Sequence, residues 1–109
     1  MAGKPYPKTV TFRSQSLRDL AKEAPHCMRR ACRVENVGQV VGCHRGGLAH
    51  GRGMGHKTHD LVAYLCFDCH NLIDRRTGDL TPEEADLEFL DAYYESNLWL
   101  FESGHMEVA

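Results

Sequence analysis

Residues 66–70 of the chain read Cys-Phe-Asp-Cys-His, and an aspartate follows at position 74. Two thiols separated by two residues suit a tetrahedral zinc ion, because one tight turn can aim both sulfurs at one point. His70 and Asp74 are four residues apart, so on a helix they lie on the same face, about one turn from each other. This short segment therefore offers half of a structural zinc site and half of a second metal site.

A second pair of cysteines can complete the zinc site. Cys27 and Cys32 are separated by four residues, and with Cys66 and Cys69 they form a C-x4-C and C-x2-C set. Four thiolates are a common ligand set for structural zinc, and binding can contribute on the order of 10 kcal/mol to the folding of a small domain. The alternative, in which the wider-spaced first pair is merely buried, stays open here. The sequence also leaves the role of Cys43 open, between a buried thiol and a residue near a metal.

The Cys-x2-Cys-His segment at residues 66–70 also matches the attachment motif of a c-type haem. That interpretation requires export to an oxidising compartment, and residues 1–7 lack the apolar stretch of a signal peptide. We therefore expect a cytoplasmic protein, in which five cysteines are more often metal ligands or free thiols than disulfides. No apolar run in the sequence approaches the ~20 residues that span a bilayer, so no membrane partner is expected.

The length of the chain, 109 residues, predicts a single folded domain. Residues 1–15 are polar, contain two prolines and are expected to form a flexible arm, which leaves residues 16–109 for the domain. Ser16 has the side chain of a helix N-cap, and Pro25 limits the helix that would follow.

The middle of the chain predicts two short strands and a short helix. Residues 37–41 and 61–65 are mostly apolar and are expected to be the strands. Residues 42–55 hold six of the ten glycines and predict a loop between them. A helix is expected at residues 70–76, directly after the second cysteine pair. Together with helices at both ends, this order predicts an α+β fold.

The last third of the chain has the clearest helix signal. Thr81 and Glu84 are spaced as a capping box, and Pro82 occupies the first helical position. Five large apolar residues then recur at helical spacing and predict the side of this helix that faces the core: Leu87, Leu90, Tyr94, Leu98 and Phe101.

The charge of the chain is distributed unevenly. Residues 1–60 carry 11 Lys and Arg against four Asp and Glu, whereas residues 61–109 carry two against 11. Such asymmetry favours a basic surface that can meet phosphate groups, with an acidic helix elsewhere. The alternative is a solvated charge pattern that serves no partner.

The order of strand, histidine, loop, strand, Cys-x2-Cys-His and helix resembles the HNH nucleases of the ββα-metal class. More narrowly, residues 43–44, 50–60 and 65–74 resemble a family of small phage- and prophage-encoded nucleases with a four-cysteine zinc site. The resemblance extends over roughly residues 27–104. It implies a small zinc-stapled ββα-metal core with an N-terminal helix and a long C-terminal helix.

The resemblance also implies an activity, the metal-dependent hydrolysis of DNA phosphodiester bonds in the cytoplasm of a bacterial host. His44 would be the general base that takes a proton from the attacking water, a task for which histidine is well suited. His70 and Asp74 would hold one catalytic divalent cation, Mg²⁺ or Mn²⁺, with Zn²⁺ as an alternative. Asp60 stands where these enzymes usually carry an asparagine that steadies the loop. His50 could assist the metal or replace His44 as the base.

Basic residues near these positions are the candidates to bind the DNA backbone: Arg45, Arg52, Lys57, Arg75 and Arg76. No small-molecule cofactor is implied. Cys43 departs from the family pattern, which commonly has an aspartate or histidine there, and a thiolate is a poor ligand for Mg²⁺. The alternative function is a non-catalytic zinc module that binds nucleic acid or another protein. The oligomeric state, the strandedness of the substrate and the choice between DNA and RNA stay open.

Overall fold

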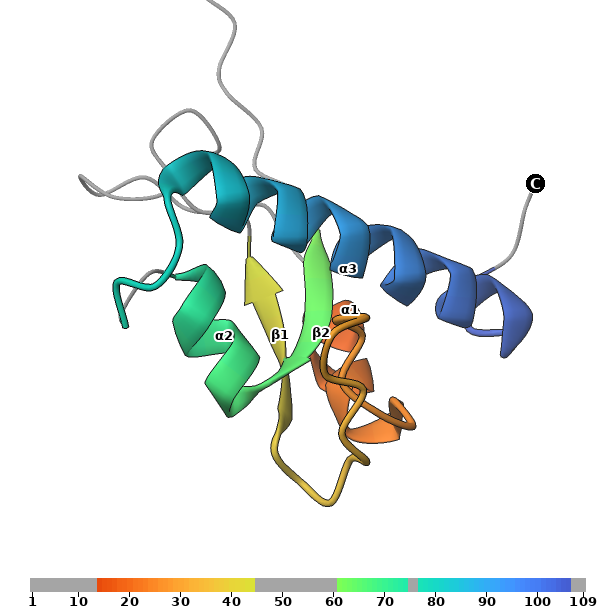
Figure 1. Cartoon of the computed structure of the whole chain (residues 1–109). Coiled ribbons are helices and arrows are strands. Elements are labelled where there is room, and N and C mark those ends of the chain that lie inside the picture. The colour runs from red at the N-terminus through yellow and green to blue at the C-terminus, as the bar shows by residue number, and fades with distance from the viewer. Residues whose placement is uncertain (1–13, 45–60, 75–76, 107–109) are drawn as a thin grey trace, which may run out of the picture.

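The computed structural model describes residues 14–44, 61–74 and 77–106 of the chain (Figure 1). Within these ranges it is a mixed α+β structure built on one two-stranded sheet. In chain order the elements are the helix α1 (Gln15–Asp19), the short 3-10 helix η1 (Leu20–Glu23), the strands β1 (Val40–His44) and β2 (Val62–Cys66), and the helices α2 (Phe67–Ile73) and α3 (Pro82–Glu102). The α+β class, with an N-terminal helix and a long C-terminal helix, is therefore confirmed.

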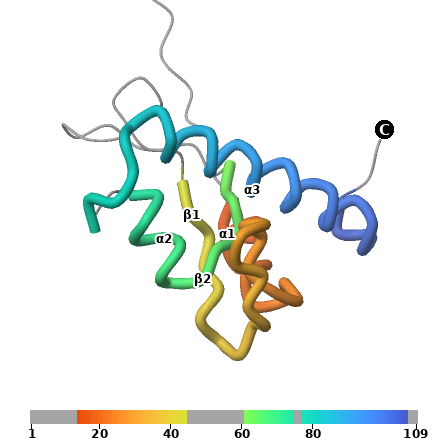
Figure 2. The backbone as a smooth tube through the Cα atoms, viewed as in Figure 1, coloured from red at the N-terminus to blue at the C-terminus, as the bar shows by residue number. Residues whose placement is uncertain are grey.

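Strands β1 and β2 pair antiparallel, with Val40 opposite Cys66 and His44 opposite Val62. Every residue of β2 is buried, because α3 packs along it while α1 and η1 pack against β1 (Figure 1). The backbone trace in Figure 2 shows the segment between η1 and β1 folding back beside β2, where the N–H of Met28 donates to the carbonyl of Tyr64 at 2.9 Å. The core thus surrounds β2.

Strand β1 begins at Val40, later than the predicted start at residue 37, because a turn occupies the residues before it. The side chain of Asn36 accepts a hydrogen bond from the N–H of Gly38 at 2.9 Å. Gly38 has a φ of 107°, a conformation that favours glycine. Val37 is 80% exposed beside this turn and does not belong to the sheet. An asparagine two residues before a glycine was the local signal for this turn.

Two helix starts also differ from the prediction. The N-cap of α1 is Ser14, whose hydroxyl accepts the N–H of Leu17 at 3.2 Å, and not Ser16. Helix α2 begins at Phe67 rather than at His70, because the last residue of β2 is itself the N-cap of α2. The chain therefore passes from strand to helix without a loop, and the second cysteine pair is fixed at that junction.

The start of α3 is as predicted. The hydroxyl of Thr81 accepts the N–H of Glu84 at 3.1 Å, and the Glu84 carboxylate accepts the N–H of Thr81 at 2.9 Å. This capping box satisfies two N–H groups that a helix N-terminus otherwise leaves unbonded. Although α3 has 21 residues, it is too polar to cross a membrane, and the other helices among the described residues are too short.

The side of α3 that faces the core is opposite to the predicted one. The buried residues are Ala85, Phe89, Ala92, Ser96 and Leu100. The predicted stripe is exposed by 39% to 67% at Leu87, Leu90, Tyr94, Leu98 and Phe101. Small side chains let the helix approach the sheet closely, and Ser96 bonds directly to it: its hydroxyl accepts the N–H of Tyr64 at 3.0 Å and donates to the carbonyl of Ala92 at 2.7 Å.

Tyr64, at the centre of β2, joins three elements. Its side chain is fully buried, and its hydroxyl donates to the carbonyl of Leu17 in α1. Its ring meets the ring of Trp99 in α3 edge-on, with centroids 5.6 Å apart. Burial raises the pKa of the Tyr64 hydroxyl to about 12, so the group stays protonated and keeps donating at any physiological pH.

The exposed stripe of α3 leads to a stability prediction. Leu87→Ala is expected to change the free energy of unfolding by no more than about 0.5 kcal/mol, because the side chain is 67% exposed. Leu100→Ala, at a residue only 4% exposed, is expected to cost about 2–5 kcal/mol, since it removes packed methyl groups and leaves a cavity. Urea unfolding of the two variants measures the difference. A larger loss for Leu87→Ala than for Leu100→Ala would contradict this orientation of α3.

Candidate metal centres

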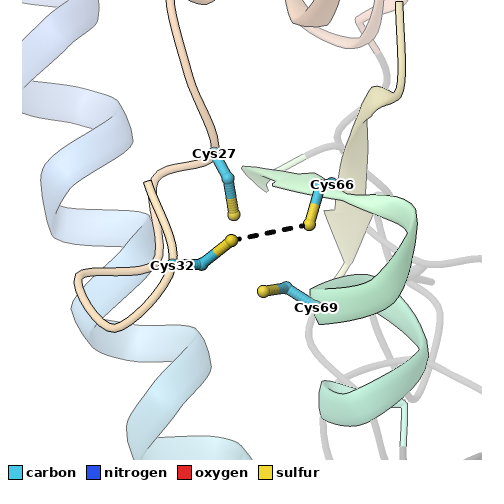
Figure 3. Close-up of side chains that lie close together, drawn as sticks. All are labelled: Cys27, Cys32, Cys66 and Cys69. Atoms are coloured by element: carbon cyan, nitrogen blue, oxygen red, sulfur yellow. Dashed lines mark hydrogen bonds between the residues drawn. The ribbon is translucent and has the colours of Figure 1, made fainter. Parts of the chain in front are cut away.

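The loop between η1 and β1 presents the first two cysteines. The N–H of Cys27 donates to the carbonyl of Val34 at 2.9 Å, and the N–H of Cys32 donates to the carbonyl of Arg29 at 2.9 Å. Arg33 has a φ of 53°, in the left-handed region, which lets the chain turn back after Cys32. These bonds close the loop, and both thiols point into the space that they share with Cys66 and Cys69 (Figure 3).

The second cysteine pair meets the first one, and together the pairs form the four-cysteine group. Cys66 ends β2 and Cys69 lies in the first turn of α2. The four sulfurs lie within 4.8 Å of one another. The sulfurs of Cys32 and Cys66 are 3.9 Å apart, and Figure 3 shows these two side chains facing each other. Sulfurs around a tetrahedral zinc with Zn–S bonds of about 2.3 Å lie roughly 3.8 Å apart. All four cysteines are free thiols, so the predicted ligand set can hold a metal ion such as zinc.

Burial acts against the ionisation of two of these thiols. It raises the pKa of Cys27 and of Cys69, and for Cys69 the charge of the neighbouring Cys27 acts in the same direction. Zinc binds the thiolate form, so metal binding must release these protons, and affinity falls as the pH is lowered. A cation among the sulfurs would supply the positive charge that makes buried thiolates favourable.

Arg29 connects the four-cysteine group to α3. Its Nε donates to the carboxylate of Glu88 at 2.5 Å, and its Nη1 lies 3.9 Å from the sulfur of Cys69. The side chain of Arg29 is 21% exposed, so this cation lies in a partly dehydrated position beside the thiols. It therefore contributes positive charge to the group and holds the cysteine loop against α3.

Two further arginines of the same loop bind the acidic face of α3. Arg30 and Arg33 donate to the two oxygens of the Glu95 carboxylate at 3.1 and 3.0 Å, and Arg30 also pairs with Asp91 at 3.4 Å. Sequence reasoning missed these pairs, although Glu88, Asp91 and Glu95 recur at helical spacing and match the basic loop in sign. Part of the positive charge of residues 1–60 is thus paired with negative charge of α3 within the same molecule.

A second group of possible metal ligands lies between β1 and the C-terminal half of α2. Nε2 of His70 lies 3.1 Å from Oδ2 of Asp74, as their four-residue spacing predicted. The sulfur of Cys43 joins them, and the three ligand atoms lie within 4.8 Å of one another. Cys43 is fully buried, and the side chain of Asp74 is 5% exposed. The structure therefore brings the fifth cysteine to the predicted second metal site.

His44, the predicted base, follows Cys43 directly at the end of β1. It is partly exposed, whereas Cys43 is fully buried. Among the described residues, His44 belongs to neither ligand group. It lies next to the second group in the chain without being one of its ligands.

The other predicted site residues lie outside the described residues and stay predictions: His50, Asp60, Arg45, Arg52, Lys57, Arg75 and Arg76. Helix α2 positions both ligand groups, because Cys69 and His70 are adjacent in it. A metal ion at the cysteines would fix the start of α2 against the cysteine loop, and would thereby orient His70 and Asp74.

No protein-family model, curated protein or solved structure matches this chain. The resemblance to HNH nucleases therefore depends on the sequence motifs alone, and it stays a prediction.

Proposed function

We propose that the protein is a metal-dependent endonuclease of the HNH class that hydrolyses DNA phosphodiester bonds. The observation that supports this proposal most is the position of His44. It follows Cys43, whose sulfur lies within 4.8 Å of ligand atoms of His70 and Asp74. A histidine that follows a ligand residue directly in the chain, but is not itself a ligand, is a candidate to move a proton near a bound ion.

The proposed roles follow from this arrangement. His44 accepts the proton of the attacking water, and His70 and Asp74 hold the divalent cation. The bound ion supplies electrostatic stabilisation of the phosphate and of the leaving oxygen. The four-cysteine group, as a structural zinc site, keeps α2 in place, so that His70 and Asp74 are already oriented when the substrate arrives.

DNA is the proposed substrate, and its backbone is the part that the protein contacts. The proposed phosphate-binding residues are Arg45, Arg52, Lys57, Arg75 and Arg76. Arg45 follows His44 directly, Arg75 and Arg76 follow Asp74 directly, and Arg52 and Lys57 belong to the basic sequence between residues 44 and 61. Contacts of this kind are independent of base sequence and weaken as salt rises.

A non-catalytic zinc module is the second candidate function. It is favoured by the four-cysteine group, which the ion pairs of Arg29 and Arg33 connect to α3 without any contribution from His44 or Asp74. Such a module would bind nucleic acid or another protein. It gives no role to a histidine at position 44, whereas the endonuclease requires one.

The test is nicking of supercoiled plasmid by the zinc-loaded protein with added Mg²⁺, Mn²⁺ or Zn²⁺, beside Asp74→Asn and a chelator control. We expect nicking that depends on the added ion and that the chelator abolishes. Asp74→Asn keeps the shape of the side chain but not its charge, and it is expected to reduce the nicking rate strongly. Branched DNA, single-stranded DNA and RNA are assayed in parallel. A folded wild-type protein that cleaves none of them would overturn the endonuclease and favour the binding module.

A further inference from the structure

The second ligand group differs in its chemistry from a site for magnesium. Its donors are a thiol, an imidazole and a carboxylate, from Cys43, His70 and Asp74. Magnesium prefers six oxygen ligands in octahedral geometry, and a thiolate is a poor ligand for it. Sulfur and nitrogen donors instead favour zinc and similar transition metals, and three protein ligands with one open position are typical of catalytic zinc sites.

The distances agree with such a site. Donor atoms on a tetrahedral zinc lie roughly 3.3–3.7 Å apart for typical Zn–N, Zn–O and Zn–S bonds. His70 Nε2 and Asp74 Oδ2 are 3.1 Å apart, and all three donors fall within 4.8 Å. Small side-chain movements therefore suffice to bring them around one ion.

The backbone holds the three donors together from different parts of the chain. Cys43 is fixed by its pairing with Ala63 in the sheet, whereas His70 and Asp74 are fixed by one turn of α2. The packing of α2 against β1 connects them. The Asp74 side chain is only 5% exposed, and burying a carboxylate is costly unless positive charge or hydrogen bonds compensate. His70 lies 3.1 Å from this carboxylate, and a divalent cation bound by both side chains would add positive charge at this position.

We infer that Cys43, His70 and Asp74 form a second metal centre with three protein ligands. This centre binds a thiophilic divalent ion, foremost zinc, in preference to magnesium. Each chain then binds two zinc ions, one at the four-cysteine group and one here. The inference rests on the proposed function for the role of this ion in cleavage, but the binding itself can be measured without any activity.

The first test is the zinc content of wild-type protein, Cys43→Ser and His70→Ala by native mass spectrometry, with folding followed by circular dichroism. Wild type is expected to bind two zinc ions, and each variant to keep one under the same conditions. Cys43→Ser is nearly isosteric and removes only the thiolate. We expect it to lower the affinity for the second zinc ion by more than the roughly 10–100-fold that is typical when a residue supporting a ligand is replaced. A single zinc ion in folded wild type, or an unchanged second ion in Cys43→Ser, would overturn the inference.

Cobalt substitution provides a test that needs no variant. The second equivalent of Co²⁺ in wild-type protein is expected to add the charge-transfer absorption of one thiolate and the intense visible bands of a four-coordinate ion. A second equivalent without thiolate absorption would overturn the inference.

Plasmid nicking separates the two proposals. An inactive protein with two zinc ions contradicts the endonuclease alone, whereas Mg²⁺-driven nicking by a protein with one zinc ion contradicts the second zinc centre alone.

Discussion

Replacing Cys66 with serine is expected to remove the structural zinc ion and to unfold most of the domain. Cys66 is 4% exposed, ends β2 and caps α2, and its sulfur lies 3.9 Å from that of Cys32. Zinc binding at a site of four cysteines contributes on the order of 10 kcal/mol to folding, which is comparable with the whole stability of a small domain. Zinc analysis and thermal unfolding followed by circular dichroism measure both effects.

Two controls separate metal loss from a simple packing defect. Cys43→Ser also replaces a fully buried thiol but lies outside the four-cysteine group, so it is expected to keep the structural zinc and the fold. Wild-type protein treated with a chelator is expected to unfold like Cys66→Ser and to refold when zinc is returned. If Cys66→Ser kept its zinc and its melting temperature, Cys66 would not be a ligand.

Replacing His44 with alanine is expected to lower the rate of cleavage by about 10²–10⁴-fold, the usual contribution of a general base. The fold and the metal content are expected to stay unchanged, because His44 is partly exposed and belongs to neither ligand group of the described residues. Single-turnover nicking rates, measured at saturating protein, report the chemical step directly. Added imidazole is expected to restore part of the lost rate, which a purely structural defect would not allow.

The matched control is His105→Ala, which removes another accessible histidine. The ring of His105 lies against Trp99, with centroids 5.3 Å apart, far along the chain from either ligand group. It is expected to nick at the wild-type rate. If His44→Ala cleaves as fast as His105→Ala, His44 is not the base, and His50 becomes the next residue to test.

The sequence by itself predicted the features that depend on neighbouring residues. The Thr81 capping box and the pairing of His70 with Asp74 were both correct, because a single helical turn determines their geometry. The four-cysteine group was also predictable, since its two pairs lie in short segments and few other arrangements use four thiols. The strand and helix starts were less accurate, because Asn36 and Cys66 change the local conformation in ways that the apolar pattern does not record.

Only the tertiary structure decided which surfaces meet. Sequence reasoning chose one apolar side of α3 for the core, but the helix packs with its opposite side, where the small Ala92 and Ser96 permit close approach to β2 between the buried Phe89 and Leu100. It could not assign Cys43, whose partners are about 30 residues away and come near only through the packing of α2 against β1. Local spacing thus determined the ligand pairs, whereas the sheet and the packing of its helices determined which ligands share one metal.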